Sequence, residues 1–136
     1  MRAAGTGLAV GLLLFSDVAV ACGESLGTGT RQLSDEKTHL VYKTVPEVPV
    51  VGRHFVLDIA LCPRGKAGAP ATLRVDAHMP EHKHGMNYQP SVSRVSPGLY
   101  RADGLMFHMP GRWELVFELH SASGAVHRLT QRLTID

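Results

Sequence analysis

Apolar and polar residues alternate in short runs over most of the chain after its first third. Four segments carry this pattern most clearly: 54–61, 73–77, 112–120 and 129–135. In the first of them Phe55, Leu57, Ile59 and Leu61 occupy every second position. A period of two is typical of β-strands with one face in a core and the other in water. The pattern therefore predicts strands in all four segments.

Turn-forming residues separate these runs. Proline, glycine and serine cluster at 46–49, 63–70, 97–98, 110–111 and 121–124, so strands recur at the spacing of about 8 to 12 residues that is typical of β-sandwiches. No long stretch carries the period of a helix. We therefore expect an all-β fold, an Ig-like antiparallel β-sandwich.

The first 21 residues have the pattern of an export signal. Arg2 supplies a positive start, 8–15 is an unbroken apolar run, and 19–21 is a small-residue Ala-Val-Ala cleavage site. The apolar run is shorter than the roughly 20 residues that a membrane-spanning helix needs, and Asp17 ends it. We expect a signal peptide over 1–21, a periplasmic or otherwise exported protein, and no transmembrane segment after cleavage; a retained helix is the weaker alternative.

The two cysteines follow the predicted cleavage site. The segment 22–37 is rich in Gly, Ser, Thr and charge and has no period, so we expect a flexible leader before one sandwich domain over 38–136. In an oxidising compartment, Cys22 and Cys62 are expected to form a disulfide. The alternative is a lipid anchor on Cys22, which is less favoured because Ala19 stands where lipoprotein signals usually carry a larger aliphatic residue.

The charge balance excludes some functions. The chain has 14 Lys and Arg against 12 Asp and Glu, a formal net charge of +2, and no long basic run. Nucleic-acid binding needs clustered positive charge, so we expect no nucleic-acid partner. Neither a nucleophile elbow nor a His-Glu-x-x-His pattern occurs, so we do not expect an enzyme.

Histidine and methionine are concentrated in two segments. The first is 76–88, DAHMPEHKHGMNY, and the second is 105–113, LMFHMPGRW. They contain four of the five methionines, the fifth being the initiator. The candidate metal ligands are His78, Met79, His82, His84, Met86, His108 and Met109.

The mixture of donors indicates copper. Thioether sulfur is a soft ligand that selects Cu(I), whereas imidazole also binds Cu(II), Zn, Ni and Fe. We therefore expect a copper site that prefers Cu(I) and also accepts Cu(II). Zinc is the competitor, but it gains little from thioethers.

The spacing suggests how three of these ligands converge. In an extended segment His82, His84 and Met86 project from one face, Lys83 projects from the other, and Gly85 allows a bend that closes the site. The alternative is a polar surface hairpin with solvated histidines and with methionines that cap the sandwich.

The remaining histidines are isolated and are not assigned to the site: His39, His54, His120 and His127. Trp113 is expected in the core.

The two segments together resemble a known family. The run Asp-Ala-x-Met-Pro-x-His-x-His-Gly-Met at 76–86, followed by Phe-x-Met-Pro-Gly-x-Trp at 107–113, is similar to the YtkA-like family of exported bacterial domains over about 48–135. The resemblance implies an Ig-like sandwich in the style of periplasmic copper carriers such as the CopC-like proteins. It carries over to Met79, His82, His84, Met86 and Met109, whereas His78 and His108 are additions, and Lys83 replaces the small residue that the family often has between the two histidines.

Two functions follow as hypotheses. The first is a periplasmic copper-binding protein, acting as a carrier, buffer or metallochaperone that exchanges copper with a partner protein. The second is a metal-independent interaction module that helps to assemble a periplasmic or respiratory complex.

Overall fold

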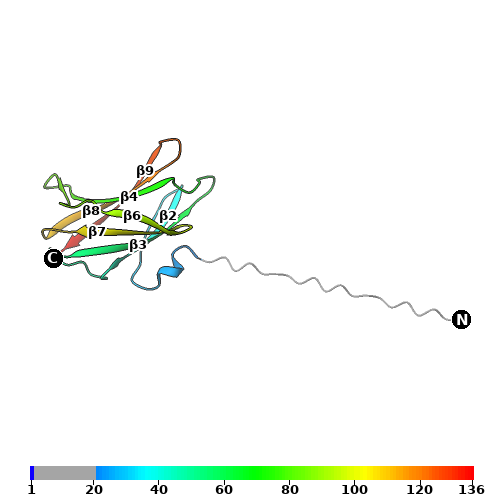
Figure 1. Cartoon of the computed structure of the whole chain (residues 1–136), viewed down its shortest axis with the longest axis horizontal. Helices are drawn as coiled ribbons and strands as arrows, with labels where there is room; N and C mark the ends of the chain where they lie inside the picture. Colours follow the sequence, from blue (N-terminus) through cyan, green and yellow to red (C-terminus); the bar gives the residue numbers. More distant parts are fainter. Residues whose placement is uncertain (2–20) are drawn as a thin grey trace.

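Two antiparallel sheets pack against each other in the computed structural model (Figure 1), and this confirms the all-β sandwich. The structure describes residues 1 and 21–136, so the predicted signal peptide lies outside the described residues except at its two ends. Within the described part of the chain, no helix is long and apolar enough to cross a membrane.

Each sheet is built from strands of alternating burial. The first sheet has the order β1-β2-β3-β7-β6 and the second has the order β5-β4-β8-β9. The strands of the first sheet are β1 (Arg31–Ser34), β2 (Thr38–Val45), β3 (His54–Pro63), β6 (Ser91–Ser96) and β7 (Leu99–Met106). Those of the second sheet are β4 (Thr72–Met79), β5 (His84–Gly85), β8 (Gly111–His120) and β9 (Val126–Ile135).

The core lies between the sheets, where the alternating apolar residues meet. Phe55, Leu57 and Ile59 of β3 are at most 2% exposed, as are Trp113 and Phe117 of β8. Burying a large apolar side chain contributes about 1.5–3 kcal/mol to stability. Because this driving force acts on one face of each strand, the pairing of β4 with β8 and of β3 with β7 is fixed in register.

The segment 22–37 differs from the expected flexible leader. It contains a short 3-10 helix, η1 (Glu24–Leu26), and all of β1. Leu26 is buried against Val41 and Ala60, two small apolar residues on the outer face of the first sheet. The Lys43 ammonium also donates a hydrogen bond to the Leu26 carbonyl at 2.5 Å. An apolar patch on the outer face therefore orders a segment whose composition predicts disorder.

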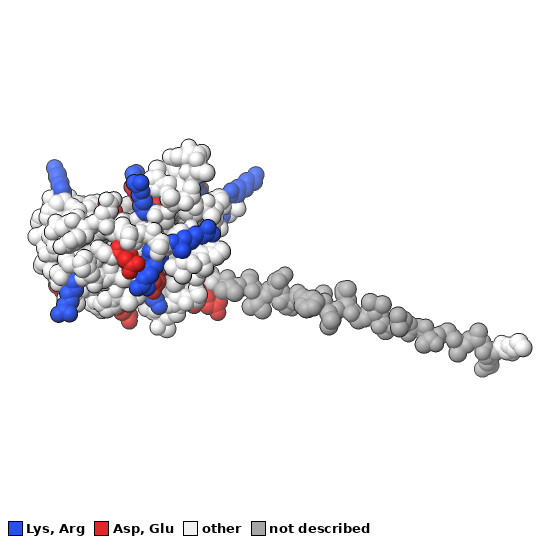
Figure 2. Space-filling model, viewed as in Figure 1, with Lys and Arg blue, Asp and Glu red and all other residues white. Residues whose placement is uncertain are grey.

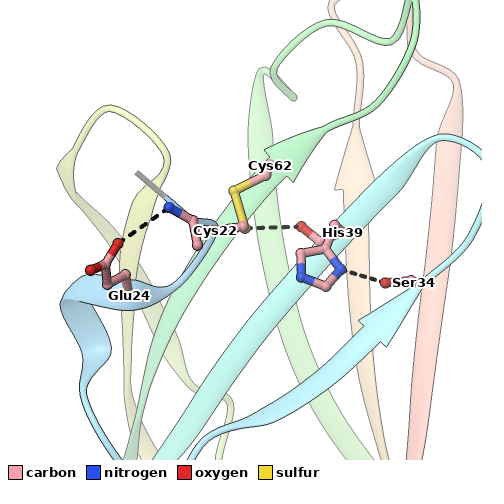
Figure 3. Close-up of a disulfide and its surroundings, with 6 residues drawn as sticks. Cys22, Glu24, Ser34, His39 and Cys62 are labelled. Carbon is pink, nitrogen blue, oxygen red and sulfur yellow. Dashed lines mark hydrogen bonds between the residues drawn. A yellow bond between two sulfur atoms is a disulfide. The ribbon is translucent and has the colours of Figure 1, made fainter. Parts of the chain in front are cut away.

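A disulfide joins Cys22 to Cys62, as predicted (Figure 3), with the two Cα atoms 6.1 Å apart. Cys62 lies near the end of β3 and pairs with His39 of β2, whose ring is hydrogen-bonded to the Ser34 hydroxyl. The Cys22 sulfur is bonded here and is therefore not free to carry the alternative lipid thioether. We call this end of the sandwich the disulfide end.

Four connections meet at the other end, which we call the loop end: 46–53, 80–83, 86–90 and 107–110. The Gly52 amide donates to the Phe107 carbonyl at 2.8 Å, which joins two of these connections. In Figure 1 the loop end and the C-terminus lie to the left, and η1 lies to the right. On the face shown in Figure 2, positive and negative side chains are interspersed.

Candidate metal centre

A tight hairpin between β4 and β5 carries His82 and His84. Met79 pairs with His84, so the turn consists of residues 80–83, and the His82 amide donates to the Met79 carbonyl at 3.1 Å. Lys83 has a left-handed backbone with φ 53°. The bend is therefore made at Lys83 rather than at Gly85, whose φ is not positive. As a consequence, His82 lies in the turn, His84 lies on β5, and Met86 begins the connection 86–90 that follows β5.

The connection between β7 and β8 carries the second group of predicted ligands. It passes from one sheet to the other at the loop end, with Phe107 fully buried. The indole nitrogen of Trp113 donates a hydrogen bond to the Met109 carbonyl at 3.0 Å. Together with the bond from Gly52 to Phe107, this contact holds the backbone on both sides of His108.

Three imidazoles from the two segments lie together. The ring centroid of His84 is 5.8 Å from that of His82 and 5.1 Å from that of His108. The ring of His108 stands edge-on to Trp113 at 5.3 Å, and His84 lies 6.4 Å from the same indole. The two segments that contain the His-Met-Pro motif are therefore neighbours at one end of the scaffold.

Two nitrogens of this cluster have no hydrogen-bond partner. His84 Nε2 and His108 Nδ1 are both buried, and neither forms a hydrogen bond. Leaving a buried polar atom unpaired costs about 1–3 kcal/mol. Such an atom in a folded protein calls for an explanation, and a bound ion is one of them. A metal ion held by both nitrogens would satisfy them together.

The predicted sulfur ligands divide into two groups. Met79 is 1% exposed and packs in the core against Gly111, where a Cβ atom would lie 2.6 Å from the Met79 methyl carbon. Met86 and Met109 are only partly buried and pack at the edge of the core. The Met86 amide donates a hydrogen bond to the Ala77 carbonyl at 3.2 Å, and this bond places the Met86 backbone beside β4. Met86 and Met109 are therefore the thioethers of the set that remain partly accessible.

His78 is separated from the other predicted ligands. Successive side chains of a strand point to opposite faces, so His78 faces away from its neighbour Met79. Its Nε2 lies 3.7 Å from the Glu114 carboxylate on β8. The alternation of Leu73, Val75 and Ala77, continued by two positions, carries the signal that separates these neighbours: it places Met79 on the core face and His78 on the opposite one.

The histidines that were not assigned to the site have other neighbours. His54 contacts Tyr88 at 5.2 Å between ring centroids, at the loop end. His120 lies 3.3 Å from Glu118, and His127 lies 2.7 Å from Asp35.

Two carboxylates in these contacts, Glu118 and Asp35, have a lowered pKa. A hydrogen bond from Arg128 holds the pKa of Glu118 below its usual range, and His120 adds to this effect. Burial acts to raise the pKa of Asp35, but the amides of Lys37 and Thr38 together with His127 outweigh it and lower the pKa.

Among residues 21–136, the described part of the protein, no group of three or more His, Cys, Asp or Glu side chains is arranged to hold a metal ion. In the imidazole cluster, the His84 ring lies next to the rings of both His82 and His108. The cluster therefore consists of two neighbouring pairs, His82 with His84 and His84 with His108. Met86 and Met109, which are neighbours of His84 and His108 in the sequence, are the partly buried residues that could add a sulfur ligand. Comparisons with protein-family models, with curated proteins and with solved structures found no match for the chain.

Proposed function

We propose that the protein is an exported copper-binding protein that carries or buffers copper, or delivers it to a partner protein. The observation that carries this proposal is the pair of buried, unpaired nitrogens on His84 and His108, whose rings lie 5.1 Å apart. His84 lies on β5 and His108 lies on the connection between β7 and β8, so the folded sandwich holds them in place before any ion arrives.

The donor types favour Cu(I). In the sequence, the partly buried Met86 and Met109 stand within two residues of His84 and His108, and thioether sulfur selects Cu(I). Zinc in structural sites takes four nitrogen, thiolate or carboxylate ligands, and thioethers do not replace them. The similarity of both motifs to the YtkA-like family supports the same proposal.

The scaffold would set the strength of binding. Trp113 fixes the Met109 carbonyl and stands against the His108 ring, so these groups lose little further freedom when they bind an ion. Since the site exists only in the folded state, copper should also raise the stability of the protein.

The test is a competition titration of the purified protein with a chromophoric Cu(I) chelator. We expect one bound copper and a dissociation constant at least about tenfold higher, or about 1.4 kcal/mol, for His84→Ala and for His108→Ala. His78→Ala is the matched control, because this imidazole faces away from the cluster and should leave the affinity unchanged. Equal affinities for all four proteins would contradict the ligand assignment.

A metal-independent interaction module is the second candidate. Val48, Val50 and Tyr88 lie on loop-end connections with exposed fractions of 74%, 51% and 51%. Exposed apolar side chains at one end of a small domain suit a protein interface. Photo-crosslinking from position 88 would test it: capture of the same partner by the His84→Ala/His108→Ala variant, in the presence of chelator, would favour this function over copper transfer.

A further inference from the structure

His82 is the exposed member of the imidazole cluster. It lies in the turn 80–83, at the tip of the β4–β5 hairpin, and its amide bonds back to the Met79 carbonyl. The second strand of this hairpin, β5, is two residues long. A short edge hairpin with few backbone bonds opens at low energetic cost. The His82 side chain is therefore placed where it can meet solvent or another protein.

The nitrogens that would hold copper are not exposed in the same way. His84 Nε2 and His108 Nδ1 are buried, although both residues are half-buried as a whole, so direct access of a chelator or a partner protein to these two atoms is restricted. Among the described residues, His82 is the exposed imidazole that stacks on a member of this pair: its ring lies 5.8 Å from that of His84, with 29° between the ring planes. This stacking leaves the exposed ring next to the buried pair.

We infer that His82 is a relay residue, through which copper passes between solvent or a partner protein and the buried pair His84 and His108; this rests on the proposed function. An incoming ion would first be bound by His82, then shared with His84, and finally held by His84 and His108. On binding, His82 would displace a solvent or chelator ligand of the ion; His84 would then be added as a second neutral nitrogen donor, and His108 would finally replace His82. No electron or proton therefore has to be supplied for the transfer.

A relay residue affects rates rather than equilibrium. Because the dissociation constant is the ratio of the two rate constants, removing His82 should slow uptake and release by similar factors. A resident ligand behaves differently, since its loss speeds release and weakens affinity. The two roles are therefore distinguished by measuring both rates and affinity on the same variants.

The experiment follows Cu(I) transfer to and from a chromophoric chelator by stopped-flow absorbance, together with equilibrium competition. For His82→Ala we expect both rates to fall by about tenfold while the dissociation constant stays within about threefold of wild type. His84→Ala should raise the dissociation constant, and His78→Ala, on the other face of the same hairpin, should change neither rates nor affinity. Since His82 is exposed, circular dichroism should show that its variant is folded.

Two results would overturn the relay. If His82→Ala weakens affinity as much as His84→Ala does, His82 is a resident ligand. If it leaves both rates unchanged while wild type binds copper, the relay fails and the proposed function stands. Failure of wild type to bind Cu(I) at all would reject the proposed function, and the relay with it.

Discussion

Gly111 allows Met79 to pack at the start of β8. Its φ is 131°, a left-handed value that favours glycine, and a Cβ atom would lie 2.6 Å from the Met79 methyl carbon. This packing explains why Met79, a predicted ligand, is buried as a core residue. Sequence composition shows that sulfur is concentrated here, and the alternation of Leu73, Val75 and Ala77, continued to Met79, indicates which thioether faces the core.

Gly111→Ala is expected to lower the free energy of unfolding by about 1–3 kcal/mol, because it adds backbone strain and a steric clash with Met79. Urea denaturation monitored by Trp113 fluorescence would measure the change. Gly124→Ala is the control, since Gly124 also has a positive φ of 87° but a Cβ atom there meets nothing within 4 Å. Equal losses in both variants would show that the clash with Met79 is not significant.

Among the elements, strands with one strongly apolar face could be predicted and weakly patterned edges could not. The alternation in β3, β4, β8 and β9 agrees with the structure because each of them packs one face in the core. β6 reads Ser-Val-Ser-Arg-Val-Ser and remains mostly exposed at an edge, so it gives little hydrophobic signal. β1 and η1 depend on contacts with residues distant in sequence, which composition does not reveal.

The hairpin that carries His82 and His84 has its bend one residue before His84. An L-residue in left-handed conformation costs about 1–2 kcal/mol, more than the 0.5–1 kcal/mol that glycine loses in chain entropy. Lys83→Gly should therefore stabilise the protein by about 0.5–1 kcal/mol in thermal or urea unfolding. Lys66→Gly, at an exposed turn position without positive φ, should instead destabilise it. A loss of stability in both variants would contradict the turn geometry.

On the scale of the whole molecule, the disulfide and the imidazole cluster occupy opposite ends of the sandwich. β3 begins with His54 at the loop end and finishes beside Cys62 at the disulfide end. The sequence predicts both features separately, from cysteine count and from His-Met clustering. The sequence does not predict that the disulfide and the imidazole cluster lie a full strand length apart. This separation depends on the direction in which β3 runs between the two ends of the sandwich.

Cys22→Ser/Cys62→Ser should lower the free energy of unfolding by about 2–4 kcal/mol, since the bond closes a chain segment with a sequence separation of 40. Copper affinity should be unchanged, because the cluster lies at the other end of the sandwich. Urea denaturation and Cu(I) competition on the same preparation would measure both quantities. A large loss of affinity in protein that is still folded would mean that the two ends are coupled.

The position of the C-terminal strand has a practical consequence for protein engineering. Ile135 pairs with Gly111, three residues after His108, so any sequence fused after Asp136 starts beside the imidazole cluster. A polyhistidine purification tag attached there would offer competing nitrogens and distort metal titrations. Fluorophores, surface linkers and affinity handles are better joined ahead of Cys22, where the length of the sandwich keeps them away from the imidazole cluster.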